Sequence, residues 1–282
     1  MEMTDGLISR IQRYSTRDGP GVRSTVFAVG CPLRCKWCAN PELIEAGMKL
    51  IFHRQRCVKC GACAGVTGSR RAGVCFYDAY ETVGVNITVM ELAAKLLRDK
   101  AFYDQSGGGV TYSGGEPALQ ADFFLEVTKR LKAESVHVAL DTSGHAPWDR
   151  LAALAEAVDL VLFDIKAVNS ETHKLYTGAD NRLILENAQR IADTGREMIV
   201  RLLLVPGVND SGQEIDGRLA FVRGLKNVRR VDILKYHRLG AGKYAGLGLD
   251  YPMEGVPECP EGSARYAAEK AMDMGFEVSV GG

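Results

Sequence analysis

The hydrophobic positions of the chain fall into short apolar runs that are separated by amphipathic stretches. Strand-like runs occur at residues 24–29, 109–113, 137–141, 160–165, 198–205 and 231–236. Most of these runs are continuously apolar rather than alternating, which is the pattern of strands buried on both faces. The pattern therefore predicts strands that are covered by other elements on both sides.

Helical patterns lie between the predicted strands. They cover residues 121–132, 148–158, 183–194 and 214–225. A further helix is predicted to begin at Thr88, because Thr88 and Glu91 have the spacing of a capping box and Leu92 and Leu96 follow on one face. Alternation of strands and helices implies right-handed crossovers and a parallel sheet.

Six strand–helix units predict an α/β fold, and we favour a partial (β/α)6 barrel that is open on one side. A doubly wound open sheet has the same sequence pattern. Both arrangements place functional side chains at the carboxyl ends of the strands. Residues 50–84 are rich in Cys, Gly and Arg and lack sustained periodicity. We expect residues 1–49 and 85–282 to form the barrel and residues 50–84 to be a small inserted module.

Charge and hydropathy argue against nucleic acid and membranes as partners. The chain has 35 Lys and Arg against 35 Asp and Glu, so it lacks the general attraction to phosphate that a basic protein has. No apolar stretch approaches the roughly 20 residues needed to span a bilayer. Residues 1–13 show neither a signal nor a transit pattern. We expect a cytoplasmic protein.

The cysteines are grouped rather than spread along the chain. Seven of the eight lie between Cys31 and Cys75, in two tight groups, and Cys259 stands apart. Cysteines two or three residues apart are poorly placed to bridge each other, but they can converge on one metal centre. Each group is therefore a candidate metal site, and Cys259 is expected to be a free thiol.

The first group, Cys31-x-x-x-Cys35-x-x-Cys38, directly follows the strand predicted at residues 24–29. A structural zinc takes four ligands, and no His lies between residues 30 and 52 to complete the set. Three cysteines can hold a 4Fe-4S cluster and leave one iron open to a substrate. A zinc loop with a remote fourth ligand stays an alternative. Trp37 either shields the cluster from water or belongs to the ordinary core.

Polar residues also follow the next predicted strands. The second strand ends in Ser113-Gly114-Gly115-Glu116-Pro117, the third in Asp141-Thr142-Ser143-Gly144, and the fourth in Asp164-Ile165-Lys166. Taken singly, these are a turn, a helix N-cap and a solvated charge. Together they place two carboxylates and an ammonium over the mouth that the first cysteine group occupies.

The cysteine spacing resembles that of the radical S-adenosylmethionine (SAM) superfamily. The resemblance implies that Cys31, Cys35 and Cys38 hold a 4Fe-4S cluster whose open iron binds the methionine part of SAM. One-electron reduction then yields a 5'-deoxyadenosyl radical. It also implies that Gly114-Gly115-Glu116 holds the methionine ammonium, and that Lys166 contacts the methionine carboxylate.

The same resemblance assigns the other strand-end residues. Asp141, Thr142 and Asp164 are expected beside the methionine, where they hold a monovalent cation. Arg201 in the fifth strand and His237 after the sixth are expected to contact the cosubstrate. Alone, Arg201 is as consistent with a buried ion pair, and a single His is more often structural than functional.

Several further segments resemble one branch of the superfamily, the activating enzymes of glycyl radical enzymes, and pyruvate formate-lyase activating enzyme in particular. They are Asp18-Gly19-Pro20-Gly21-Val22-Arg23, Phe102-Tyr103 with the Gly-rich run at residues 106–111, Tyr236-His237-Arg238-Leu239-Gly240, and Lys243-Tyr244. The resemblance implies an oxidoreductase whose substrate is a glycine of a large partner protein. It also implies anaerobic function and an electron donor of the flavodoxin or ferredoxin type.

The second group, Cys57-x-x-Cys60-x-x-Cys63 followed by Cys75, resembles a shortened ferredoxin insert. Thr67 stands where the fourth cysteine of the first ferredoxin run is expected. Four thiolates remain for one auxiliary 4Fe-4S cluster, and a zinc site with four cysteines is the alternative. Its role would be electron delivery to the first cluster or docking of a partner.

Two other functions compete with this hypothesis. One is radical SAM chemistry on a small molecule or a nucleotide. The other is a ferredoxin-like electron carrier or a zinc-stabilised binding protein without turnover. Formation of 5'-deoxyadenosine separates catalysis from the second alternative.

Overall fold

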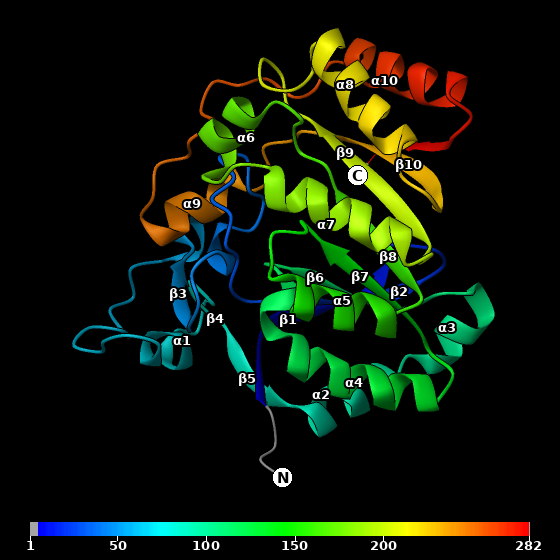
Figure 1. Cartoon of the computed structure of the whole chain (residues 1–282). Helices are drawn as coiled ribbons and strands as arrows, with labels where there is room; N and C mark the ends of the chain where they lie inside the picture. The colour runs from blue at the N-terminus through cyan, green and yellow to red at the C-terminus, as the bar shows by residue number, and fades with distance from the viewer. Residues whose placement is uncertain (1–4, 282) are drawn as a thin grey trace.

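A nine-stranded sheet forms the centre of the computed structural model, which describes residues 5–281 (Figure 1). The strand order is β11-β10-β9-β8-β7-β6-β2-β1-β5. The parallel strands are β2 (Arg23–Ala28), β6 (Gly109–Gly114), β7 (His137–Thr142), β8 (Leu160–Asp164), β9 (Met198–Leu204), β10 (Val228–Lys235) and β11 (Glu277–Val280). β1 (Asp5–Ser15) and β5 (Val85–Thr88) extend the sheet in antiparallel orientation.

The six strands predicted from the apolar runs correspond to β2 and to β6 through β10. The sheet ends in two edges, β5 and β11, so the parallel strands form a barrel that stays open, as expected. Three strands of this sheet were missed: β1, β5 and β11. β1 and β5 pair only in antiparallel orientation, and their partly exposed residues do not produce the continuous apolar runs on which the prediction relied.

Most of the helices connect the parallel strands and cover the outer face of the sheet, whereas the helix at residues 241–247 packs against residues 41–43 and 49–52 (Figure 1). They are α2 (Val89–Leu97), α3 (Lys100–Ser106), α4 (Ala121–Ala133), α5 (Trp148–Ala157), α6 (Ser170–Thr177), α7 (Arg182–Asp193), α8 (Gly212–Arg223), α9 (Ala241–Leu247) and α10 (Glu261–Asp273). The capping box at the start of α2 is confirmed, since Thr88 and Glu91 exchange both hydrogen bonds. Within residues 5–281, no helix has the length and apolarity that crossing a membrane requires.

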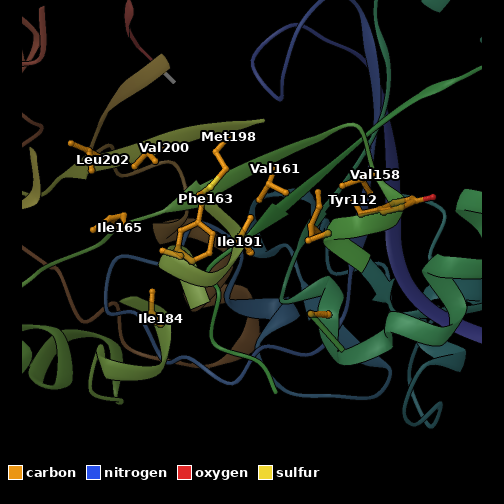
Figure 2. Packing of buried hydrophobic residues seen from close by; sticks show 14 of the residues in the cluster. Tyr112, Val158, Val161, Phe163, Ile165, Ile184, Ile191, Met198, Val200 and Leu202 are labelled. Atoms are coloured by element: carbon orange, nitrogen blue, oxygen red, sulfur yellow. The ribbon is translucent and has the colours of Figure 1, made fainter. Parts of the chain in front are cut away.

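The central parallel strands, β2 and β6 through β9, are buried on both faces, as their apolar runs predicted. On the outer face, Phe163 of β8 packs against Ile184 and Ile191 of α7 in the main core (Figure 2). On the opposite face, Leu162 and Ile199 belong to a separate, smaller core cluster. Side chains alternate between the faces of a strand, so one strand supplies residues to both cores.

The segment between β3 (Lys49–Phe52) and β4 (Tyr80–Val83) contains the second cysteine group and a short helix, α1 (Arg70–Val74). β3 and β4 form a separate antiparallel two-stranded sheet. Ile51 and Val83 of this sheet pack in one cluster with Phe27 and Val29, at the end of β2. The segment is thereby attached to the strand that leads into the first cysteine group.

Candidate active site

A layer of polar side chains lies at the carboxyl ends of the parallel strands, on one face of the sheet. Every second residue of a strand points to that face. Leu162 and Ile199 are paired in the register of β8 and β9, and two residues further along Asp164 is paired with Arg201. Both pairs face the same side of the sheet. The apolar layer on that side is therefore followed directly by an ion pair.

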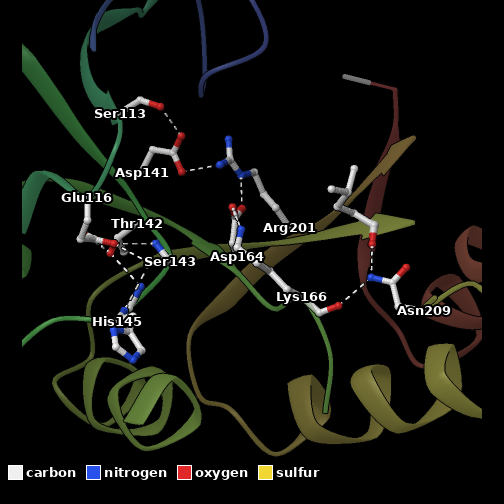
Figure 3. A network of polar contacts seen from close by, with 12 residues as sticks. Ser113, Glu116, Asp141, Thr142, Ser143, His145, Asp164, Lys166, Arg201 and Asn209 are labelled. Atoms are coloured by element: carbon white, nitrogen blue, oxygen red, sulfur yellow. Dashed lines mark hydrogen bonds and ion pairs between the residues drawn. The ribbon is translucent and has the colours of Figure 1, made fainter. Parts of the chain in front are cut away.

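Arg201 is the centre of this layer (Figure 3). Its Nε donates to Asp164 Oδ1 at 2.8 Å, and its Nη2 donates to Asp141 Oδ1. Ser113 Oγ donates to Asp141 Oδ2 at 2.5 Å, and Lys166 Nζ donates to Asp164 Oδ2 at 2.9 Å. The ends of four strands are joined by one network of two carboxylates and two cations.

Burial and pairing shift the pKa values in this network. Burial raises the pKa of Asp141 despite the neighbouring Arg201. Burial also acts on Asp164, but Arg201 and Lys166 outweigh it and lower the pKa of this carboxyl. Burial disfavours the charged forms of Lys166 and Arg201, yet the nearby carboxylates raise the pKa of both above their usual range. At neutral pH the ammonium of Lys166 is therefore charged.

The loop with Cys31, Cys35 and Cys38 is held by backbone hydrogen bonds to two segments. The amide of Cys31 donates to the carbonyl of Ile44 at 2.8 Å. The amides of Arg34 and Lys36 donate to the carbonyls of Thr177 and Tyr176, at the carboxyl end of α6. The last carbonyls of a helix lack partners within the helix, so this loop satisfies the end of α6 while α6 fixes the loop.

One cavity of about 260 Å³ brings the two polar systems together. It is lined by the three cysteines of the first group and by strand-end residues from both halves of the sheet. The predicted site residues among its lining are Cys31, Cys35, Trp37, Cys38, Gly114, Gly115, Asp141, Asp164, Lys166, Arg201 and His237. Trp37 is 7% exposed and its ring stacks on Tyr176, so it is part of the core and of the cavity wall at once.

Glu116 and Thr142 were predicted to contact the cosubstrate or a cation, but in this structure neither lines the cavity. Glu116 is fully buried and accepts hydrogen bonds from the Thr142 hydroxyl at 2.7 Å and from the amide and hydroxyl of Ser143. Burial raises its pKa. In this arrangement Glu116 ties the end of β6 to the end of β7.

Gly114 and Gly115 allow the end of β6 to approach the end of β2. The Gly115 amide donates to the Ala28 carbonyl at 2.9 Å. A Cβ atom at Gly115 would lie 2.1 Å from the carbonyl oxygen of Gly30, which is far inside van der Waals contact. Gly114 has φ +98°, in the region that favours glycine. The two glycines therefore place the first cysteine loop beside the cavity.

The three cysteines fit a metal cluster chemically. Burial raises the pKa of Cys31 to about 11 and that of Cys35 to about 12, and it raises the pKa of Cys38 as well. Without a bound metal group these three side chains are therefore neutral thiols at neutral pH. A bound metal group would deprotonate them, because coordination to a metal stabilises the thiolate. Among residues 5–281, no three His, Cys, Asp or Glu side chains are grouped as a site for a single metal ion. A cavity of 260 Å³ bounded by three thiols has the donor set that a 4Fe-4S cluster uses.

The second cysteine group surrounds a cavity of its own, of about 40 Å³. All four of its cysteines line this cavity: Cys57, Cys60, Cys63 and Cys75. Val58, Tyr77 and Tyr80 complete the wall with apolar and aromatic surface. The four cysteines of the second group therefore lie around one small cavity, and the bound group predicted there stays a prediction.

Several site residues were not found from the sequence. Ser113 and Ser143 lie inside the predicted motifs and bond Asp141 and Glu116, and their position beside those motifs was a usable signal. Asn209 donates to the carbonyl of Lys166 at 2.6 Å (Figure 3). Thr177 holds the cysteine loop through its backbone carbonyl, so its side chain leaves no sequence signal.

Comparison with known proteins places these observations in a family. The model of the radical SAM superfamily matches residues 25–218. The chain is 36% identical to the choline trimethylamine-lyase activating enzyme of Oleidesulfovibrio alaskensis, with 97% of each covered. It is also 36% identical to the pyruvate formate-lyase 2-activating enzyme of Escherichia coli, with 98% of this chain and 92% of that protein covered.

Solved structures agree with these matches. A domain of pyruvate-formate lyase-activating enzyme from Bacteroides vulgatus superposes with a TM-score of 0.53 and 26% identity, over all of that domain and 62% of this chain. A radical SAM methyltransferase from Sphaerobacter thermophilus, at 15% identity, shares the fold with a TM-score of 0.59 over 97% of this chain and 76% of its own. The chain belongs to the radical SAM superfamily and, within it, to the activating enzymes of glycyl radical enzymes.

Proposed function

We propose that the chain activates a glycyl radical enzyme by reductive cleavage of SAM at the site of Cys31, Cys35 and Cys38. The observation that carries the proposal is the cavity of 260 Å³, in which three thiols face a buried network of two carboxylates and two cations. When bound, a 4Fe-4S cluster on these cysteines supplies the electron that cleaves SAM to methionine and a 5'-deoxyadenosyl radical. A glycine of the partner protein then gives up a hydrogen atom.

The side chains of the cavity bind and orient the cosubstrate. Lys166 brings a permanent ammonium, which suits the methionine carboxylate, and Asp164 keeps this ammonium in place at 2.9 Å. Arg201 fixes Asp141 and Asp164 relative to each other. Trp37 and His237 form part of the cavity wall, where they help to exclude water from the reacting atoms.

We extend the proposal to the two glycines and to a cation. Backbone groups at Gly114 and Gly115 line the cavity and suit the methionine ammonium. A monovalent cation beside Asp141, Thr142 and Asp164 has to compete with Arg201, which already bridges the two carboxylates. Titration of the loaded protein with K⁺ in the presence of SAM tests for this cation, and a SAM affinity that is independent of K⁺ contradicts it.

We propose that residues 50–84 act as a separate functional module that holds one auxiliary 4Fe-4S cluster on Cys57, Cys60, Cys63 and Cys75. The support is the single cavity that all four thiols line. A flavodoxin or ferredoxin-type donor is the proposed source of electrons. The proposed setting is an anaerobic cytoplasm, because a radical site must exclude oxygen.

Anaerobic loading of the protein with iron and sulfide tests the proposed function. With dithionite and SAM, the protein is expected to form 5'-deoxyadenosine, and with its partner it is expected to produce a glycyl-radical doublet by electron paramagnetic resonance. Cys31→Ala is expected to abolish cleavage, whereas Cys60→Ala retains part of it. A protein that holds only zinc at Cys31, Cys35 and Cys38 would refute the proposal. Cleavage without a doublet on any protein would instead favour a small-molecule substrate.

A further inference from the structure

The segment around the second cysteine group is basic, although the chain as a whole has no net charge. Residues 54–78 contain one acidic side chain, Asp78, against five basic ones: Arg54, Arg56, Lys59, Arg70 and Arg71. The positive charge is therefore concentrated around one structural feature, the four cysteines. Such a local charge attracts acidic molecules over the distance of a Debye length.

Three of these basic side chains face solvent without a carboxylate beside them. Arg54, Lys59 and Arg70 are exposed, and none of them forms an ion pair within the described residues. Elsewhere, some exposed bases, such as Lys129 and Arg182, pair with a carboxylate on the same helix. The charges near the cysteines are thus left available to an outside partner.

Large apolar side chains lie among these charges. Phe76 is 87% exposed, the largest exposed fraction among the large hydrophobic side chains of residues 5–281. Val58 is 56% exposed and Tyr77 49% exposed, and both line the cavity of the four cysteines. Aromatic side chains surrounded by charge are typical anchors of protein interfaces. A loop that only faces water gains no stability from exposing three large apolar side chains in one segment.

We propose that these six residues form a docking surface for an acidic protein that carries one electron at a time. The surface consists of Val58, Phe76 and Tyr77 with Arg54, Lys59 and Arg70. The inference rests on the proposed function, in which Cys57, Cys60, Cys63 and Cys75 hold a redox-active cluster. One electron would leave the reduced carrier and be taken up by the oxidised cluster that these cysteines would hold, with no bond formed or broken.

The position of the surface favours an electron carrier over the glycyl radical enzyme. Every residue that lines the large cavity lies at positions 31–40 or 113–237, outside the segment with the second cysteine group. The glycine of the protein substrate must reach that cavity. A protein seated on Phe76 and Tyr77 instead covers the second cysteine group, where electron transfer takes place.

The attachment of the segment keeps the two cysteine groups in fixed relation. Ile51 of β3 packs with Val29, two residues before Cys31. Ile51 also lies against Gly246 of α9, where a Cβ atom would come within 2.6 Å of its side chain. A carrier bound to the segment is therefore held at a defined position relative to the first cysteine group.

Charge reversal tests the docking surface. The variant Arg54→Glu/Lys59→Glu/Arg70→Glu is compared with the matched control Lys95→Glu/Arg98→Glu/Arg130→Glu, whose sites are also exposed but lie on α2, at its end and on α4. The affinity of the iron-loaded proteins for a small acidic bacterial ferredoxin is measured by calorimetry at low and high salt. Wild-type affinity is expected to fall with salt. The first variant is expected to bind about tenfold more weakly at low salt, because several charge pairs are inverted, and the control within about twofold.

Phe76→Ala provides an independent test of the apolar anchor. We expect about tenfold weaker binding with an unchanged salt dependence, because the variant removes contact area and no charge. Iron content and circular dichroism confirm that each variant is folded and loaded. Binding of the ferredoxin by both variants at wild-type affinity would overturn the proposal.

Cleavage of SAM distinguishes failure of the docking surface from failure of the proposed function. Dithionite is small and needs no docking surface, so the wild-type protein and the charge variant are expected to form 5'-deoxyadenosine at equal rates with it. With reduced ferredoxin, only the charge variant is expected to show a raised KM for the carrier. No product from the wild type with dithionite would refute the proposed function itself. Weakened binding of the glycyl radical enzyme, with carrier binding intact, would reassign the surface to the protein substrate.

Discussion

Lys166 lines the cavity beside the three cysteines, and its ammonium is charged. Asp164 keeps a second partner, Arg201, when the ammonium is removed, so Lys166→Met is expected to fold. We expect the affinity for SAM to fall about tenfold to a hundredfold, the usual effect of losing a charge-assisted hydrogen bond. Equilibrium binding measures it, with the exposed Lys174→Met of α6 as control. Equal affinity of the two variants would contradict the assigned role.

His173 of α6 makes stability depend on pH. Its Nδ1 lies 2.7 Å from the Ala179 carbonyl oxygen, and its buried Nε2 has no partner among the described residues. Burial lowers its pKa, so the unfolded chain binds a proton more readily than the folded one. The stability that the neutral ring confers is present above the unfolded pKa, roughly 6.5, and is lost as the pH falls below it.

The variant His173→Asn isolates this effect, because the Asn amide can still donate to Ala179 while it cannot be protonated. Urea unfolding at pH 7.5 and pH 5.5 is expected to show a larger loss of stability for the wild type, by up to about 1.4 kcal/mol. His137, whose pKa burial also lowers, contributes equally to both proteins. Identical losses in the two proteins would show that His173 is accessible to protons in the folded state.

Among single residues, the sequence predicted those whose position follows from the element that they belong to. Cys31, Asp141 and Lys166 could be placed because each follows a recognisable strand, and the carboxyl ends of parallel strands meet. The orientation of Glu116 could not be predicted, since it depends on Ser143, 27 residues away. Backbone contacts such as that of Thr177 with the cysteine loop carry no side-chain signal.

At the scale of the elements, the close approach of β6 to the end of β2 requires a residue without a side chain at position 115. Gly115→Ala puts a Cβ atom 2.1 Å from the Gly30 carbonyl oxygen, and we expect a loss of stability on the order of 2 kcal/mol from the forced separation of β2 and β6. Gly242→Ala in α9 is the matched control, because no atom lies within 4 Å of its Cβ position. The control is expected to be neutral or stabilised by up to about 1 kcal/mol. Chemical unfolding compares the two, and similar changes would refute the steric explanation.

Elements that pack on both sides were predictable, and edge elements were not. β7, β8 and β9 lie within one or two residues of their predicted bounds, because their burial requires continuous apolar residues. α9 has only seven residues, two of which are Gly, and its place is set by contact with β3 rather than by an amphipathic pattern. Short helices of this kind depend on tertiary packing.

At the scale of the whole molecule, Lys243 connects two segments that are far apart in the sequence, α9 and residues 40–42. Its Nζ lies 2.6 Å from Glu42 Oε1 and 2.6 Å from Asn40 Oδ1, next to the first cysteine group. Glu42 is 2% exposed, and its other cation, Arg10, is 3.5 Å away. Lys243→Met leaves a buried carboxylate poorly compensated, so we expect a loss of about 3 kcal/mol.

Hydrogen exchange locates this loss. Faster exchange is expected in β3, β4 and residues 41–43, because α9 packs against β3 and residues 41–43, and β4 pairs with β3. The central strands β8 and β9 are expected to stay protected. Lys243→Arg keeps the charge and is expected to retain most of the protection. Uniform acceleration over all strands would show that Lys243 stabilises the entire sheet rather than the attachment of the inserted segment.

The distribution of the cavity wall along the chain affects the order in which the two cysteine groups mature during translation. The four thiols of the second group have all emerged once Cys75 is made, whereas the wall around the first group is finished only with His237. At bacterial elongation rates the interval is on the order of ten seconds. We therefore expect iron to reach Cys31, Cys35 and Cys38 only after residues up to His237 have been made and have folded.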